Sequence, residues 1–254
     1  MKYTTLPNTS LKVSKICLGN MTFGNQNSEA DAHEQLDFAL DSGGNFIDTA
    51  EMNPVPLIAE RQGWTEKFIG SWLTKTGNRD KIILATKIAG SSRGIFQNIR
   101  ENLDFSEKSL DDALHKSLKR LQTDHIDLYQ LHWPERSVNI FGQRDYDYTS
   151  NTEWEDNIGA ILDRLETYVD EGKIRYLGLS NETPFGLMRY MEEHRKGKIK
   201  MVSTQNAYSL IQRRDEIGLT EVLQMEDVGY LAYSPLAVGV LSGKYLDNAK
   251  PEGA

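Results

Sequence analysis

The feature that most constrains this chain is a regular alternation of short apolar runs with longer amphipathic segments. Near-continuous apolar runs of this length, rich in β-branched residues, are typical of strands buried on both faces of a parallel sheet. We therefore predict strands at NFIDTA (45–50), KIILATKI (81–88), IDLYQLHW (126–133), IRYLGLSN (174–181), MVSTQNAYS (201–209) and GYLAYSPL (229–236), with SKICLGNM (14–21) as a further candidate.

The segments between these runs have the pattern of amphipathic helices. In 106–123, leucines recur at three- and four-residue spacing, acidic residues come early and basic residues late, which suits the helix dipole. Segment 28–44 begins with a Ser cap followed by acidic residues and ends on glycine. We predict further helices at 157–173, 184–198 and 217–229.

Strands that alternate with helices indicate a right-handed βα series, for which a doubly wound open sheet and a (β/α)₈ barrel compete. The G-x-G-x-x-G motif of dinucleotide-binding open sheets does not occur in the sequence. Polar residues instead follow strand after strand, as expected for a barrel with its site on the carboxyl face. We predict one (β/α)₈ TIM barrel domain over residues 1–254, with these polar strand ends: Asp48, Lys87, His132, Ser180, Asn181, Gln205 and Tyr233.

Charge and cysteine content exclude several classes of function. The net charge of −8 is spread along the chain, which argues against nucleic-acid or membrane-surface binding, because both need clustered Lys and Arg. Cys17 is the only cysteine, so an intrachain disulfide or a thiolate metal cluster is excluded, and a reducing cytoplasm fits best. The histidines lack metal-ligand spacing, and GVLSGKY fails the phosphate-loop pattern. We expect neither a signal peptide nor a membrane span.

The chain resembles the aldo-keto reductase family over nearly its whole length, because six motifs stand in the order and at the spacing that are typical of this family. The stretches IDTAEMNPVP and WPERSVNIFG are most similar to its Tas-like bacterial branch, with potassium-channel β subunits as more distant relatives. The resemblance implies reduction of an aldehyde or ketone with NADP(H) as cofactor. The motifs are NFIDTAEM, ILATK, DLYQLHWPE, GKIRYLGLSN, TQNAYSL and YSPLAVGVLSGKY.

The resemblance also implies a catalytic tetrad of Asp, Tyr, Lys and His. Asp48, Lys87 and His132 match three of its members, and Asn53 stands at the Tyr position. A carbonyl that accepts hydride needs a proton, and a tyrosine near pKa 10 is too weak an acid unless a cation lowers that pKa. A buried Lys paired with an Asp supplies the positive potential, and a His orients the substrate oxygen. Taken singly, Asp48 could be a helix cap and His132 a core residue.

Asn53 departs from the family pattern, because an amide can hydrogen-bond a carbonyl but cannot deliver a proton at neutral pH. We expect carbonyl reduction to be weakened by about 10²–10⁴-fold. Tyr129 is no substitute, since it should point to the opposite face of its strand from His132. Two further readings stay open: a cofactor-binding sensor or regulatory subunit that needs no turnover, and an inactive copy.

For the cofactor, the resemblance implies that Ser180, Asn181 and Gln205 bind the nicotinamide carboxamide and that Tyr233 stacks on its ring. The alternatives are a helix cap at 180–181 and a simple turn at 233–236. Backbone N–H groups of 234–239 would wrap the pyrophosphate. The phosphate-binding lysine would be Lys244, and the loop that borders the nicotinamide would contain Asn20, Met21 and Gln26. The pyrophosphate segment would comprise Ser234, Pro235, Leu236, Ala237, Val238 and Gly239.

Two segments raise questions that the sequence leaves open. The stretch 134–152 carries Phe141, Tyr146 and Tyr148 and could be a substrate lid or only a surface excursion. In the family, an eighth strand, its helix and a basic segment for the adenosine 2′-phosphate would follow LDNAKPEGA, so we expect a barrel without its last β/α unit in this chain. Without the basic segment, the prediction that NADPH is preferred over NADH is weaker. The substrate and oligomeric state stay open.

Overall fold

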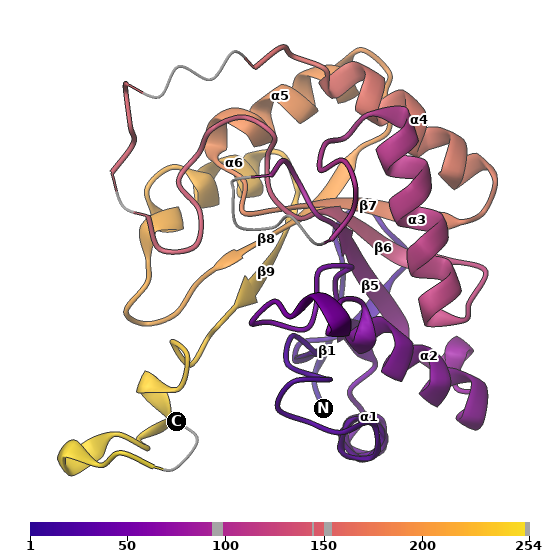
Figure 1. The fold of residues 1–254 in the computed structure, drawn as a ribbon. Coiled ribbons are helices and arrows are strands. Elements are labelled where there is room, and N and C mark those ends of the chain that lie inside the picture. Colours follow the sequence, from indigo (N-terminus) through magenta and orange to yellow (C-terminus); the bar gives the residue numbers. More distant parts are fainter. Residues whose placement is uncertain (93–98, 144, 150–153, 252–254) are drawn as a thin grey trace.

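The computed structural model describes residues 1–92, 99–143, 145–149 and 154–251. Its main feature is a sheet of seven parallel strands that forms a nearly closed barrel, with helices along the outside (Figure 1). Each strand pairs with the next one along the chain, from β3 to β9. The strands are β3 (Cys17–Gly19), β4 (Phe46–Asp48), β5 (Ile83–Ile88), β6 (Ile126–Leu131), β7 (Ile174–Ser180), β8 (Met201–Ala207) and β9 (Gly229–Tyr233).

All seven predicted strands are present, each shorter than the apolar run that predicted it, which confirms the barrel architecture. All five predicted helices are also present. One helix, α2, was not predicted: it starts after Gly63, a left-handed residue with φ +78° and no capping side chain, so its sequence lacks the usual start signal. The helices are α1 (Glu29–Asp41), α2 (Trp64–Thr76), α3 (Glu107–Leu121), α4 (Ile158–Asp170), α5 (Pro184–Arg195) and α6 (Leu219–Met225).

Shorter elements complete the described chain. An antiparallel hairpin of β1 (Tyr3–Thr5) and β2 (Lys12–Ser14) precedes the barrel and was not predicted. Its Leu11 and Val13 pack with Phe46 and Leu128, so the hairpin covers the amino ends of the strands. The 3₁₀ turns are η1 (Ala59–Arg61), η2 (Arg79–Lys81), η3 (Arg214–Glu216), η4 (Val240–Ser242) and η5 (Leu246–Asn248).

The core has two layers, set by the alternation of side chains along each strand. One layer lies between the sheet and the helices and includes Tyr129, Trp72 and Leu114. The other fills the barrel around Phe46, Ala85 and Leu128. Asp48, Lys87 and Gln130 each lie two residues further along the same strands, so their side chains point into the barrel at its carboxyl end.

None of the helices in the described ranges is long and apolar enough to cross a membrane.

Candidate active site

A buried ion pair lies inside the barrel at the carboxyl ends of β4 and β5. Lys87 Nζ is 2.5 Å from Asp48 Oδ2 and also donates to the carbonyl of Thr49 at 2.8 Å. The other oxygen of Asp48, Oδ1, accepts from Gln130 Nε2 at 2.9 Å and Gln205 Nε2 at 3.1 Å. Both carboxylate oxygens are therefore fixed, and the ammonium is held in one place.

His132 follows β6, and its N–H donates to the carbonyl of Ile88 at 2.9 Å. Its ring nitrogen Nδ1 is buried and has no hydrogen-bond partner among the described residues. Burial, with a smaller contribution from the charge of Lys87, holds the pKa of His132 well below its usual value. The imidazole is therefore neutral near pH 7, and its ring lies 4.9 Å from that of Trp133.

Asn53 is buried in the loop after β4, five residues beyond Asp48. Its N–H donates to Ala50 at 3.1 Å, and its carbonyl accepts from Gly63 at 2.8 Å. The side-chain amide makes no hydrogen bond to any described residue. The same loop contributes Ala50 and Met52 to a buried apolar cluster with these members: Ala50, Met52, Ala89, Ile99, Trp133, Val138 and Ile140.

The two tyrosines of the neighbouring strands do not take over the role of a proton donor. Tyr129 lies in the layer between sheet and helices, as predicted, where burial raises the pKa of its hydroxyl well above 10. Tyr233 donates its hydroxyl to Asn181 Oδ1 at 2.7 Å. Burial, together with the charge of Asp215, raises the pKa of Tyr233 to about 12. Both are weaker acids than an exposed tyrosine.

Four of the residues assigned to the nicotinamide are linked by hydrogen bonds at the ends of β7, β8 and β9. Ser180 Oγ donates to the carbonyl of Gln205 at 2.8 Å. Asn181 Nδ2 donates to the carbonyl of His132 at 2.9 Å and to Ser180 Oγ at 3.2 Å, while its Oδ1 accepts from Tyr233. These residues therefore form one connected group beside the Asp48–Lys87 pair.

The predicted loop after β3 is only partly connected to this group. Asn20 is buried, and its N–H and Nδ2 donate to the carbonyl of Asp48 at 3.1 and 3.2 Å. Its Oδ1 is buried and has no hydrogen-bond partner in the part of the chain that the structure describes. Met21 and Gln26 are exposed. The carbonyl of Met21 accepts from the N–H of Val55 at 2.9 Å, which joins this loop to the segment that carries Asn53.

Residues 234–239 run from the end of β9 away from the barrel (Figure 1). Ser234, Ala237 and Val238 have φ of +52°, +49° and +55°, a conformation that non-glycine residues adopt rarely and that clusters at ligand clamps. The N–H groups of Ala237 and Gly239 donate to carbonyls of the same turn. Those of Leu236 and Val238 make no backbone bond there, and Pro235 has no N–H.

Lys244 lies close to this segment. A Cβ added at Gly239 would lie 2.5 Å from Lys244 Cε, so the side chain of Lys244 packs directly against Gly239. Its Nζ is 5.0 Å from the ring centre of Tyr245. An exposed lysine beside free backbone N–H groups suits a phosphate, and the orphaned Asn20 Oδ1 suits an amide donor, so the described residues fit a nicotinamide nucleotide.

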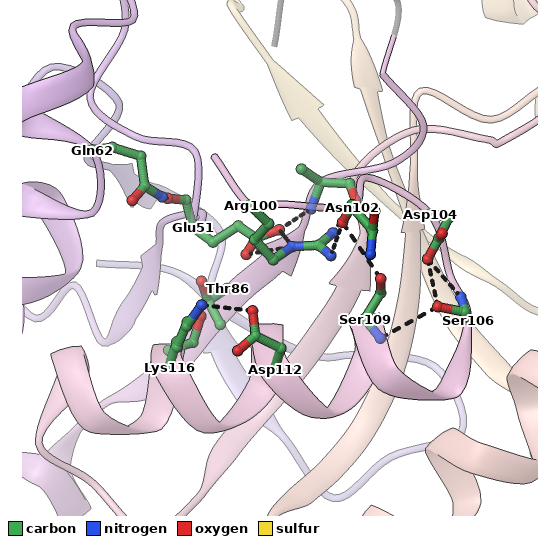
Figure 2. Close-up of polar contacts among 12 residues, drawn as sticks. Glu51, Gln62, Thr86, Arg100, Asn102, Asp104, Ser106, Ser109, Asp112 and Lys116 are labelled. Atoms are coloured by element: carbon green, nitrogen blue, oxygen red, sulfur yellow. Dashed lines mark hydrogen bonds and ion pairs between the residues drawn. The ribbon is translucent and has the colours of Figure 1, made fainter. Parts of the chain in front are cut away.

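The sequence analysis missed two groups that hold the site. Gln130 lies two residues before His132 on the same strand face, and this period-two spacing was the available signal. The second group is a buried pair of Glu51 and Arg100, with Nε–Oε1 3.0 Å (Figure 2). Glu51 also accepts from Ala89 N at 2.6 Å, and Arg100 donates to Asn102 O at 2.6 Å. Arg100 is distant in sequence, and no spacing pattern connects it to Glu51.

The described part of the predicted lid borders a pocket of about 790 Å³ whose lining also includes Asn181 and Tyr233. Phe141 and Tyr146 line the pocket, whereas Tyr148 is 90% exposed. Residues 144 and 150–153 lie outside the described chain. A lid function therefore stays a prediction.

The chain is similar in sequence to known proteins of one family. A family model described as "Aldo/keto reductase family" matches residues 15–254. The chain is 51% identical to "Protein tas" of Escherichia coli (strain K12), over all of this chain and 73% of that protein. It is 36% identical to "Uncharacterized oxidoreductase YrpG" of Bacillus subtilis (strain 168), over 97% of this chain and 70% of that protein. It is 31% identical to "Norsolorinic acid reductase B" of Aspergillus parasiticus, over 92% of this chain and 57% of that protein.

Proposed function

Because this chain belongs to the aldo/keto reductase family, a family of oxidoreductases, we propose that it reduces aldehydes or ketones to alcohols, with NADPH supplying the hydride when bound. The observation that carries this proposal is the buried Asp48–Lys87 pair beside a neutral His132 at the carboxyl end of the barrel. Structural ion pairs are common, but one that faces the mouth of a barrel next to an unpartnered imidazole is typical of a catalytic site.

In this proposal, Lys87 and His132 act on the oxygen of the substrate carbonyl. The ammonium of Lys87 is fixed by Asp48 and supplies a positive potential where negative charge develops on that oxygen. His132 is neutral, so one ring N–H is available to orient the oxygen by a hydrogen bond. Fixed donors of this kind need no reorganisation during the reaction.

Asn53 limits the reaction because its amide orients the carbonyl without protonating it. Removing a general acid typically costs about 10²–10⁴-fold in rate. The raised pKa values of Tyr129 and Tyr233 support this assignment, since neither hydroxyl replaces the missing acid.

The residues that would hold the cofactor are those linked at the ends of β7 to β9. Tyr233 would support the nicotinamide ring, and Ser180, Asn181 and Gln205 would bind its carboxamide, with Asn20 beside them. The segment 234–239 and Lys244 would bind the phosphates. These residues alone do not predict whether NADPH or NADH is preferred.

The proposed substrate is a small carbonyl compound in the cytoplasm. One relative, at 31% identity, is named for the reduction of norsolorinic acid, which supports an organic small molecule as the substrate. The net charge of −8 argues against nucleic acid or a membrane surface as a partner.

A second candidate function is a sensor or regulatory subunit that binds the cofactor without turnover. Asn53 favours it, because the scaffold keeps Asp48, Lys87 and His132 but lacks the acid. Tight NADPH binding, no reduction by any variant and a stable protein partner in a pull-down would support it.

The test begins with a fluorescence titration of the chain with NADPH and NADH. Saturable binding is expected from the connected residues at the barrel mouth. Asn53→Tyr should then raise turnover of an activated aldehyde by about 10²-fold or more, whereas Asn53→Phe, which adds a ring without a hydroxyl, should not. If the Tyr variant binds NADPH and reduces no activated aldehyde, the reductase proposal is wrong.

A further inference from the structure

Gln130 places an amide in the interior of the barrel, where it is completely buried. It lies on β6 between Lys87 of β5 and Gly178 of β7, its paired residues on the two neighbouring strands. A Cβ added at Gly178 would lie 3.2 Å from Gln130 Cγ, so a glycine at this point leaves room for the long amide side chain. The packing therefore accommodates this amide next to the buried ion pair.

The orientation of this amide is fixed by one hydrogen bond. Gln130 Nε2 donates to Asp48 Oδ1 at 2.9 Å. Because a carboxylate oxygen only accepts, the amide nitrogen must face Asp48 and the amide oxygen Oε1 must face away from it. Gln130 Oε1 is buried and has no hydrogen-bond partner among the residues that the structure describes. A buried acceptor without a partner costs stability, so the stability of the fold does not by itself favour glutamine at this position.

Asp48 Oδ1 has a second donor, Gln205 Nε2, at 3.1 Å. The two glutamines differ in access. Gln205 is 8% exposed and, under the proposed function, would also contact the nicotinamide carboxamide, whereas Gln130 is 0% exposed and is too deep to contact a ligand. Without Gln130, the Oδ1 oxygen of Asp48 would be held by Gln205 alone. Lys87 Nζ, which donates to the other carboxylate oxygen of Asp48 at 2.5 Å, would then be fixed less firmly.

We propose that Gln130 is a positioning residue: it fixes the carboxylate of Asp48, and through it the ammonium of Lys87, while it contributes little to net stability. Its effect on turnover rests on the proposed function, but its effect on Lys87 can be measured without cofactor or substrate. An apolar side chain of similar length would remove both the hydrogen bond to Asp48 and the unpartnered Oε1. These two changes have opposite effects of similar size on stability, and Asp48 Oδ1 keeps Gln205 as a donor.

The test variant is Gln130→Met, because methionine is close to glutamine in length and volume and its thioether donates no hydrogen bond. The matched control is Tyr129→Phe, which changes the adjacent residue of β6 on the opposite face. The Tyr129 hydroxyl is also buried without a partner among the described residues, so this variant removes an unpartnered polar atom away from the site. Urea denaturation should give midpoints at or above that of the original chain for both variants.

Acetylation of lysines by acetic anhydride, followed by peptide mass spectrometry, reports on Lys87 in the full chain without NADPH. Lys116, whose side chain is 54% exposed, is the internal reference. Gln130→Met should raise the labelling rate of Lys87 relative to that of Lys116 several-fold, because an amine that is held less firmly meets the reagent more often. Tyr129→Phe should leave this ratio unchanged.

Turnover gives a second readout. In the Asn53→Tyr background, Gln130→Met should lower kcat by about 10- to 100-fold, because small displacements of catalytic groups have effects of this size. KM should stay nearly unchanged, since Gln130 does not touch the substrate. Tyr129→Phe in the same background should change neither value.

Three results would overturn the inference. A urea midpoint of Gln130→Met that falls as far as that of Lys87→Met would assign Gln130 a structural role. An unchanged Lys87 labelling ratio, or an unchanged kcat in an active Asn53→Tyr background, would remove the positioning role and leave the reductase proposal standing. Failure of the proposed function is a different result, because an Asn53→Tyr variant that reduces no aldehyde leaves the effect of Gln130→Met on Lys87 labelling intact.

Discussion

Lys87 Nζ lies 2.5 Å from Asp48 Oδ2, and the two side chains are only 4% and 12% exposed. Removing one partner of a buried ion pair leaves an uncompensated charge and costs about 3–5 kcal/mol. We expect Lys87→Met to lower the free energy of unfolding by about that amount. Urea denaturation measures it.

The control for this prediction is Lys116→Met. Lys116 pairs with Asp112 at 2.6 Å on the surface of α3, where the two side chains are 54% and 41% exposed. Exposed helix pairs contribute about 0.3–0.5 kcal/mol. Adding Asp48→Asn to Lys87→Met should recover part of the loss, because Gln130 still has an acceptor at position 48. Equal effects of Lys87→Met and Lys116→Met would show that the buried pair is not needed for stability.

The sequence predicted the parts of the fold that local patterns encode. The seven strands followed from apolar runs, and the placement of Asp48, Lys87 and His132 at one mouth followed from parallel strands ending on one side. Tyr129 was correctly placed away from the site, because side chains alternate along a strand.

Other parts depend on contacts between distant residues and could not be predicted. Helix α2 has no capping signal, since Gly63 starts it by its backbone conformation. The link from Glu51 to Arg100 joins two loops, and the linkage of Asn181 to both His132 and Tyr233 joins three strand ends. Such pairs are determined by tertiary packing rather than by periodicity, so a single sequence contains no local signal for them.

The lowered pKa of His132 makes stability depend on pH. In the unfolded chain an imidazole takes up a proton near pH 6.5, whereas the folded protein holds His132 neutral to lower pH. The unfolded state therefore binds more protons below about pH 6.5, so the free energy of unfolding falls as the pH is lowered toward the folded pKa. The slope from this residue approaches about 1.4 kcal/mol per pH unit.

His132→Gln removes this contribution. Urea denaturation of both proteins between about pH 7 and about pH 5.5 isolates it, because all other titrating groups are shared. The stability of the His132→Gln variant relative to the original chain should rise as the pH falls. A constant difference across this range would contradict the burial of a neutral imidazole.

The Glu51–Arg100 pair is buried, so it should contribute to stability as the Asp48–Lys87 ion pair does. Burial raises the pKa of Glu51, although Arg100 lowers it, so the carboxylate depends on its partner. Glu51→Gln leaves the Arg100 guanidinium without a counter-charge and should cost about 3–5 kcal/mol. Glu101→Gln changes an exposed carboxylate and should stay within about 0.5 kcal/mol. Similar urea midpoints for the two variants would show that Arg100 finds other partners.

Gly70 allows α2 to approach α3 closely. A Cβ at this position would lie well inside contact distance of the Arg120 carbonyl oxygen and 2.8 Å from the Leu121 carbonyl carbon. These are backbone atoms, so the helices would have to move apart. Gly70→Ala should therefore destabilise the protein by about 1–3 kcal/mol, even though alanine is the better helix former.

Gly159→Ala is the matched control, because Gly159 lies in α4 and its nearest atom would be the side-chain oxygen Glu193 Oε2 at 3.3 Å. That oxygen can move, so the variant should be neutral or slightly more stable than the original chain, by up to about 1 kcal/mol. Thermal and urea denaturation of the two variants give the comparison. A Gly70→Ala protein as stable as Gly159→Ala would mean that α2 and α3 separate without loss of packing, and the close approach at Gly70 would then contribute nothing to stability.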